Sequence, residues 1–286
     1  MSVQAAAAAG RMDGGATDAL EGQFPVIKNL LYEIAGINLS ETKRPLVLSR
    51  ITRRLRATGH TSVREYLAFV QSAEGRKELT EMVDVLTTNK TSFFREDAHF
   101  EYMRESWLPT MAPGQVHSLW SAGCSSGEEP YTVAMVYAEF AGSGRTHGRP
   151  ACRILATDLS NRVLEKAKRG LYREEQLASI PEALRRKYFR TSSGSGVFEV
   201  SERLRRMVRF ARLNLMDRWP MKGPFDGIFC RNVMIYFDRG TREVLVQRFE
   251  KLLRPGGLLF VGHSESLTSL RHGLDYVRPA LYRKGA

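Results

Sequence analysis

A glycine-rich turn followed directly by two acids is the first pattern in the sequence that could do chemistry. The apolar segment HSLWSAG, typical of a buried strand, leads into a turn from Gly123 to Gly127, and a helical segment begins at Glu128 or Glu129. Glycines in such a turn let a ligand approach the backbone closely. Two acids at a helix N-terminus disfavour a pyrophosphate there. The Glu129 carboxylate suits a ribose hydroxyl or a cationic ligand, although the preference of helix N-termini for negative charge explains one glutamate equally well.

A second acid stands where the next expected strand ends. The segment ILATD closes with Asp158, and a helical segment, NRVLEKAKRG, follows. In dinucleotide folds an acid at this place bonds ribose hydroxyls, whereas the alternative is that Asp158 or Ser160 caps the helix. The turn and the acid in this order indicate a nucleoside site. Because no phosphate-binding glycine pattern accompanies them, they favour S-adenosylmethionine over NAD.

Two later segments are expected at the same edge of the sheet. ARLNLMD contains Asn214 and Leu215, which could lie at the rim of an adenine. FDGIFCRNVMIYF reads as a strand that carries Arg231, Asn232 and Tyr236 beyond its end, although the pattern is slightly more typical of Tyr236 as a half-buried core aromatic. Amine methyltransferases that act on flipped bases commonly carry an Asn-Pro-Pro-aromatic motif at this strand. Here Asn232 is followed by Val-Met-Ile, which argues against a nucleobase substrate.

Cysteine and histidine show no metal-ligand spacing. Cys124, Cys152 and Cys230 are isolated among apolar residues, and the 6 histidines form no paired pattern. We therefore expect buried, reduced thiols and no metal site.

Basic residues gather in one segment of a chain whose net charge is +12. From Lys43 to Arg64 there are 7 basic residues and no acidic one. At 100° per residue, four arginines fan across the face opposite an apolar stripe: Arg50, Arg53, Arg54 and Arg56. A face of one sign suggests an acidic partner, and the alternative is a basic surface without function.

The elements that must position these residues form two predicted domains. Residues 1–20 read as a disordered leader without the features of a secretory signal, and four short helices follow in a domain spanning 21–86. Residues 87–100 read as a linker contributing to the cofactor site, and 101–286 alternate strands and helices. This alternation predicts an α/β fold with a doubly wound, mostly parallel sheet. No run approaches the roughly 18 apolar residues of a membrane span, so we expect a cytoplasmic protein without membrane insertion.

Three details of the second domain follow from turn residues. The helix TREVLVQRFEKLL is expected to end at the turn Pro255-Gly256-Gly257, and the tail LDYVRPALYRKG is expected to form one final antiparallel strand. Short strands around a Gly/Ser turn predict an inserted β-subdomain at about 172–212.

Four long motifs resemble one family. TTNKTSFFRE, SAGCSSGEEPYT, FDGIFCRNVMIYF and LLRPGGLLFVGHSE together resemble the signature of the CheR-type chemotaxis receptor methyltransferases, and INLSETKRPLVLSRITRRLRATG looks like that family's basic second helix. The resemblance runs from about residue 24 to about residue 283.

The resemblance implies an N-terminal helical domain joined to a class I, Rossmann-like methyltransferase domain. Its implied activity is methyl transfer from S-adenosylmethionine to glutamate carboxylates of methyl-accepting chemotaxis receptors, which leaves S-adenosylhomocysteine. Arg95 and Tyr236 would line the methyl-transfer region. The implied cofactor contacts are Asn89, Thr91, Arg95, Glu129, Asp158, Asn214, Leu215, Arg231 and Asn232, and the glycine-rich turn adds Gly123.

The implied partner is the acidic methylation region of a chemoreceptor coiled coil, which the four arginines would contact. The loop from Arg190 to Gly196 is short and lacks an acidic residue, which puts the tethering of a receptor's C-terminal peptide in doubt. Two other functions stay open. An RNA or DNA methyltransferase would explain the charge, although no aromatic residues interleave with the basic face and no nucleic acid is expected. A non-catalytic adaptor that binds the cofactor as a signal would carry the same residues.

Overall fold

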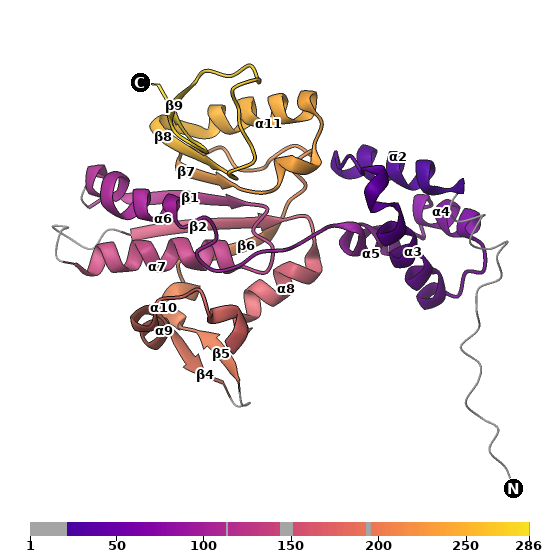
Figure 1. The fold of residues 1–286 in the computed structure, drawn as a ribbon, viewed down its shortest axis with the longest axis horizontal. Coiled ribbons are helices and arrows are strands. Elements are labelled where there is room, and N and C mark those ends of the chain that lie inside the picture. Colours follow the sequence, from indigo (N-terminus) through magenta and orange to yellow (C-terminus); the bar gives the residue numbers. More distant parts are fainter. Residues whose placement is uncertain (1–21, 113, 144–150, 193–195, 286) are drawn as a thin grey trace, which may run out of the picture. The chain divides into compact units, whose positions relative to one another are not determined.

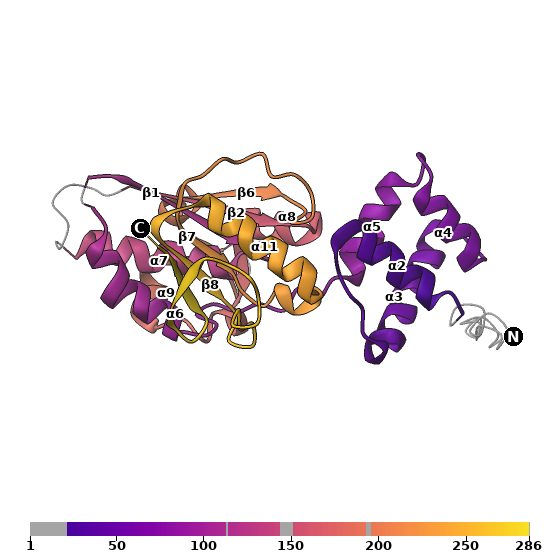
Figure 2. The same cartoon turned by 90° about the horizontal axis from the view of Figure 1, so that it is seen from above.

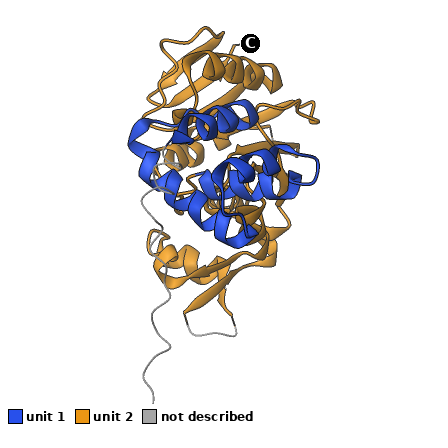
Figure 3. Ribbon diagram, turned by 90° about the vertical axis from the view of Figure 1, so that its right-hand side faces the viewer, with its two compact units in different colours: residues 1–87 blue, residues 88–286 orange. Residues whose placement is uncertain are grey.

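The chain folds into two compact units, Met1–Thr87 and Thr88–Ala286 (Figure 1 and Figure 3). The structure is a computed structural model that describes residues 22–112, 114–143, 151–192 and 196–285. The expected leader, residues 1–20, lies outside the described residues. In the part of the chain that is described, no helix has both the length and the apolar character needed to cross a bilayer.

The first unit is all-helical. Gly36 and Gly59 follow two of its helices in left-handed backbone conformation, where the absence of a Cβ avoids strain, and the Ser62 side chain caps a third. Its core is apolar and includes Phe24, Ile51 and Tyr66, each fully buried. The elements are α2 (Phe24–Ala35), the short 3-10 helix η1 (Glu41–Lys43), α3 (Arg44–Thr58), α4 (Val63–Gln71) and α5 (Arg76–Leu86).

A mostly parallel sheet of seven strands organises the second unit, in the order β6-β2-β1-β7-β8-β10-β9. The first five in this order pair in parallel and the hairpin of the last two is antiparallel. The doubly wound prediction is therefore confirmed. The strands are β1 (Val116–Ala122), β2 (Ala151–Asp158), β6 (Val208–Arg212), β7 (Phe225–Cys230), β8 (Leu253–Val261), β9 (Leu274–Arg278) and β10 (Leu281–Lys284).

Helices cover both faces of this sheet (Figure 2). Successive side chains of a strand point to opposite faces, and Leu119 and Trp120 of β1 accordingly belong to different apolar clusters. The Leu119 cluster contains α7 and the turns after α6, and the Trp120 cluster contains α11. The helices are α6 (Ala98–Tyr102), the π-helical turn η2 (Met103–Trp107), the 3-10 turn η3 (Leu108–Thr110), α7 (Glu128–Gly142), α8 (Asn161–Arg169) and α11 (Arg239–Leu252).

A small antiparallel sheet with the strand order β3-β5-β4 forms the inserted subdomain. The prediction had extended this subdomain to residue 212, but β6 pairs in parallel with β2 from Val208 onward and therefore belongs to the main sheet. Within the Arg190–Gly196 loop, residues 193–195 lie outside the described residues. The subdomain's elements are β3 (Leu171–Arg173), η4 (Glu174–Leu177), α9 (Glu182–Tyr188), β4 (Phe189–Thr191), β5 (Val197–Val200) and α10 (Glu202–Arg205).

Two other turn predictions were wrong. Helix α11 ends at Leu252, and Pro255-Gly256-Gly257 lies within β8, which starts at once because Leu253 already pairs with Phe225. The extra residues bulge, since β8 advances from Leu253 to Leu258 while β7 advances from Phe225 to Gly227. The tail is a hairpin of β9 and β10 rather than one strand, because Ala280 at the turn takes φ 62° and reverses the chain.

Candidate active site

The strand order of the main sheet reverses at β1, whose neighbours are β2 on one side and β7 on the other. Ligands of open α/β sheets bind at such a switch point, beyond the carboxyl ends of the strands. The turn after β1 lies there. Gly123 takes φ 83°, and a Cβ on it would lie 2.4 Å from Cγ2 of Val233, in the loop after β7. Glycine at this position therefore lets two loops of the crevice approach each other.

Asp158 joins the ends of two neighbouring segments. Its Oδ2 accepts a hydrogen bond from the Ser125 backbone N at 2.8 Å, and its Oδ1 accepts one from the Ser160 backbone N at 3.0 Å. The Ser160 hydroxyl, rather than the Asp158 carboxylate, caps α8 through the Val163 backbone N. Of the two predicted roles of Asp158, the helix cap is thus taken by Ser160. Since each carboxylate oxygen has two lone pairs, Asp158 keeps the capacity to accept a ribose hydroxyl.

The segment 88–97 is bound to the same turn. The Ser125 hydroxyl donates to the Asn89 carbonyl at 2.9 Å. Arg95 is half-buried and donates to the Lys90 carbonyl at 2.9 Å, which folds the segment back on itself around Thr91. Its flanking residues Phe94 and Glu96 take φ 51° and 56°. Non-glycine residues in this left-handed region are uncommon and concentrate at functional sites.

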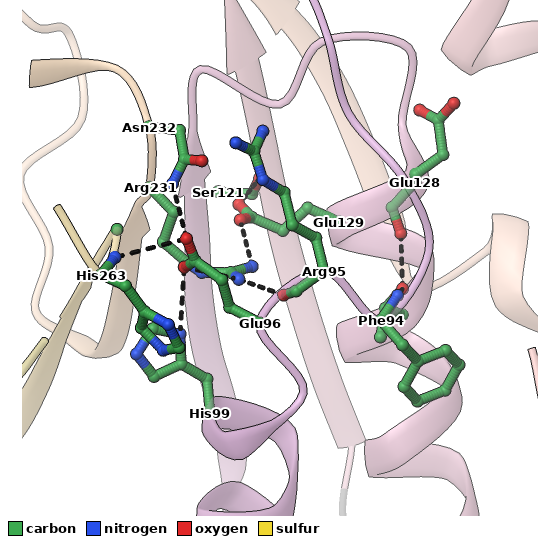
Figure 4. A network of polar contacts seen from close by, with 12 residues as sticks. Phe94, Arg95, Glu96, His99, Ser121, Glu128, Glu129, Arg231, Asn232 and His263 are labelled. Atoms are coloured by element: carbon green, nitrogen blue, oxygen red, sulfur yellow. Dashed lines mark hydrogen bonds and ion pairs between the residues drawn. The ribbon is translucent and has the colours of Figure 1, made fainter. Parts of the chain in front are cut away.

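Arg231 is the buried centre of an ion-pair network (Figure 4). Its guanidinium pairs with Oε2 of Glu129 at 3.0 Å and with Oε2 of Glu96 at 3.1 Å, donates to the Arg95 carbonyl, and lies 5.2 Å from the centre of the Phe100 ring. Glu129 in turn accepts from the Ser121 hydroxyl at 2.7 Å. A buried cation is tolerated only when it is paired and hydrogen-bonded, as here. The network joins β1, α7, β7 and the segment before α6.

Glu96 was not predicted as a site residue from the sequence. Its carboxylate connects the segment before α6 with the loops after β7 and β8. Besides Arg231, its carboxylate accepts from Nδ2 of Asn232 at 3.1 Å and from the His263 backbone N at 3.3 Å. Asn232 takes φ 61°, and its side chain is directed at Glu96. The only signal for Glu96 in the sequence is its place in the TTNKTSFFRE motif, because its partners are far away along the chain.

Glu265 was also missed, and it shapes the loop that carries Tyr236. Its buried carboxylate accepts from the backbone N of Asn232 at 2.7 Å, of Ile235 at 3.1 Å and of Gly262 at 2.6 Å. Burial raises the pKa of Glu265, and these backbone donors oppose the rise. Tyr236 lies half-buried in the 3-10 turn η5 (Met234–Tyr236) that follows.

The segment after β6 reaches the Asp158 strand end through its backbone. The Leu213 backbone N donates to the Asp158 carbonyl at 2.9 Å. Asn214 accepts from the Met216 backbone N at 3.1 Å, which stabilises the turn, and Leu215 is buried in the Trp120 cluster. Asn214 is therefore at the crevice edge, as the strand order requires, while Leu215 belongs to the core.

Glu96, His99 and His263 also lie together, although histidine spacing had predicted no metal site. One possible ligand atom from each lies within 4.8 Å of the others. Burial, and next the positive charge of Arg231, lower the pKa of His99 to about 3.

The cysteines are buried and free, as expected, and burial raises the pKa of all three thiols.

In the first unit, two of the four arginines assigned to an acidic partner are engaged internally. Arg54 forms a forked pair with Glu78 of α5 at 2.8 and 2.5 Å, and Tyr66 donates to the same carboxylate at 2.8 Å. Arg50 donates to the carbonyls of Leu86 and Thr87 at the end of α5. The prediction of an outward face was wrong for these two, because their partners lie on another helix. Arg53 and Arg56 are exposed.

Comparisons with known proteins cover both units. The family model described as CheR methyltransferase, SAM binding domain, matches residues 89–280, and the one described as CheR methyltransferase, all-alpha domain, matches residues 22–87. A chemotaxis protein methyltransferase of Borreliella burgdorferi is 41% identical over 262 residues, which cover 89% of this chain and 91% of that protein. One of Escherichia coli is 42% identical over 253 residues, 87% of this chain and 86% of that protein. Chemotaxis protein methyltransferase 2 of Pseudomonas aeruginosa is 38% identical over 262 residues, 91% of each chain.

Proposed function

Because the chain belongs to the CheR family of S-adenosylmethionine-dependent chemotaxis methyltransferases, we propose that it esterifies glutamate side chains of chemoreceptors. The observation that carries the proposal is the match of both units to curated chemotaxis methyltransferases over nearly their full length. The acceptor would be the acidic methylation region of a receptor coiled coil. The products of the reaction would be a γ-glutamyl methyl ester and S-adenosylhomocysteine.

The crevice residues fit S-adenosylmethionine. The close approach at Gly123 and the absence of a phosphate-binding glycine pattern in the turn suit a nucleoside without phosphates. Asp158 would accept the ribose hydroxyls, Asn89 and Asn214 would contact the nucleoside, and Glu129 would attract the positively charged end. When bound, the cofactor supplies a methyl group on a sulfonium, which is open to displacement by an anion.

The acceptor needs no general base. A glutamate carboxylate, with a reference pKa of about 4.3, is already ionised at neutral pH. Its oxygen would take the methyl group, and the carbon–sulfur electron pair would leave with the sulfur of S-adenosylhomocysteine. The chain's residues therefore contribute alignment and exclusion of water. This agrees with Cys124, within the turn, because burial raises the pKa of its thiol and keeps the thiol protonated.

Arg95 and Tyr236 would hold the incoming carboxylate. A guanidinium binds a carboxylate through paired, charge-assisted hydrogen bonds, and the half-buried Arg95 has further donors besides the one given to Lys90. Tyr236 would fix the second side of the acceptor. Arg231 differs from them, because its guanidinium is buried and engaged with Glu96 and Glu129. Its role would be to orient Glu129 and the loop after β7.

A test measures the ester itself. Purified chain is incubated with methyl-labelled S-adenosylmethionine and receptor-containing membranes of its own organism, and the protein is then treated with alkali. We expect volatile labelled methanol, which amine methylation does not release. Arg95→Ala should lower the rate about 100-fold, in the range expected for loss of an orienting group. Arg186→Ala, on the exposed side of α9, is the matched control and should leave it unchanged.

The alternatives give different results in the same assay. Cofactor binding without alkali-labile label would contradict the esterification of receptors. Label in nucleic acid would then support a base methyltransferase, and no label in any fraction would support an adaptor that binds the cofactor as a signal.

A further inference from the structure

Two histidines and a glutamate from two segments of the chain lie close together near Arg231. Glu96 precedes α6, His99 lies in α6, and His263 follows β8. Figure 4 shows the two imidazole rings beside the Glu96 carboxylate. The rings of His99 and His263 are 5.2 Å apart at 71°, and one possible ligand atom from each of the three residues lies within 4.8 Å of the others.

His99 is the unusual member, because its imidazole is almost fully buried, beside the Ala280 backbone. Only 2% of its surface is exposed, and within the described part of the chain neither ring nitrogen makes a hydrogen bond of good geometry. Its Nδ1 lies 3.9 Å from Oε2 of Glu96. This distance is too long for a hydrogen bond. When two ligand atoms bind the same metal ion at about 2.0–2.2 Å, the two atoms lie roughly 3–4 Å apart. The distance between Nδ1 of His99 and Oε2 of Glu96 falls in this range.

The surrounding charge permits a cation. Arg231 and Arg278 are the guanidinium groups that act on His99, and Arg231 pairs with two carboxylates, Glu96 and Glu129. Two guanidinium groups and two carboxylates leave the cluster about neutral, so a bound cation meets no net repulsion. Asn232 and the His263 backbone N also donate to Glu96, so its carboxylate is held in place by groups outside the ligand set. Such supporting contacts are typical of metal ligands.

We propose that Glu96, His99 and His263 bind a divalent transition-metal ion of the zinc class. Two imidazoles and a carboxylate are the donor set that such ions prefer, whereas calcium and magnesium prefer oxygen ligands alone. His263 is exposed and gives the ion its route from solvent. The fourth position would be filled by water. The site is additional to the methyl-transfer reaction proposed above, which requires no metal.

Direct metal titration tests the site independently of methyl transfer. The full chain, without a histidine tag and stripped with chelator, is titrated with Zn²⁺ against a chromophoric chelator. One ion per chain is expected. His263→Ala should weaken binding more than about 100-fold, because even the loss of an outer contact of a metal ligand costs about 10–100-fold. This variant keeps the backbone N that Glu96 accepts from, and its exposed position preserves the fold.

The control is His60→Ala in the first unit, which should bind Zn²⁺ as the parent chain does. Co²⁺ provides a second readout, since histidine and carboxylate ligands give visible bands without the thiolate charge-transfer band that cysteine ligands produce. Far-ultraviolet circular dichroism verifies that each variant is folded. Absence of stoichiometric binding, unchanged affinity in His263→Ala, or a thiolate band in the Co²⁺ spectrum would each overturn the proposal.

Discussion

Arg231 illustrates what can and cannot be inferred about a single residue. Its position beyond β7 followed from the strand pattern, and the resemblance implied a cofactor contact. In the structure its guanidinium pairs with Glu129 and Glu96, which are 102 and 135 residues away along the chain. No periodicity reports partners at such separations. For the same reason Glu96 and Glu265 were missed, although each accepts from backbone or side chains of several segments.

His99 gives a prediction on pH. The unfolded chain takes up a proton at this histidine below about pH 6.5, whereas the folded chain holds the pKa of His99 at about 3. The free energy of unfolding therefore falls as the pH decreases between these values. At about 1.4 kcal/mol per unit, His99 alone accounts for a loss of about 2 kcal/mol between pH 6.5 and 5.

Urea unfolding of the metal-free chain at several pH values measures this loss. His99→Gln lacks the titrating ring and should show a pH dependence shallower by about that amount. Equal slopes for His99→Gln and the parent would show that His99 takes up its proton in the folded chain as easily as in the unfolded one.

At the scale of elements, local signals predicted the helices well and the turns poorly. The glycines after α2 and α3 and the Ser62 cap of α4 act within one turn of the backbone, so they are readable from neighbouring residues. Whether Pro255-Gly256-Gly257 forms a turn or part of a strand depends on the adjacent strand β7, whose Phe225 pairs with Leu253. The Arg54–Glu78 pair likewise joins two helices, and α3 alone gave no sign of it.

The loop after β7 offers a prediction about an element. Glu265→Gln would turn one of its oxygens into an NH₂ group that faces backbone N–H donors of Asn232, Ile235 or Gly262. An unsatisfied buried donor costs about 1–3 kcal/mol, so we expect a free energy of unfolding lower by about 2 kcal/mol. Because the loop carries Asn232 and Tyr236, kcat should fall about tenfold or more, equivalent to about 1.4 kcal/mol.

Denaturant unfolding and steady-state kinetics with varied cofactor and acceptor measure both effects. Glu105→Gln, at an exposed position, is the matched control and should change neither. Glu265→Asp keeps the charge and should restore part of the kcat. A parent-like kcat in a destabilised Glu265→Gln chain would limit Glu265 to a role in folding.

At the scale of the whole molecule, the net charge of +12 first suggested an acidic partner without identifying it. Fewer arginines of α3 face outward than the sequence predicted, since Arg50 and Arg54 form hydrogen bonds within the first unit. Arg53 and Arg56 stay available for an acidic receptor surface, where charge would act mainly on the rate of association. The two-unit organisation and the family were readable because they depend on long motifs and periodicity. The ion-pair network around Arg231 could not be predicted from the sequence, because its residues come together only when the sheet has formed.

Mapping the methylated residue tests the central claim most directly. A purified receptor coiled-coil fragment is incubated with the chain and S-adenosylmethionine, digested at acidic pH to preserve esters, and sequenced by tandem mass spectrometry. We predict a methyl group on glutamate side chains, no methylation when those glutamates are replaced by alanine, and methylation about 100-fold slower with the Arg95→Ala chain. Methylation of lysine, arginine or added nucleic acid instead of glutamate, by a chain that binds the cofactor, would contradict the account.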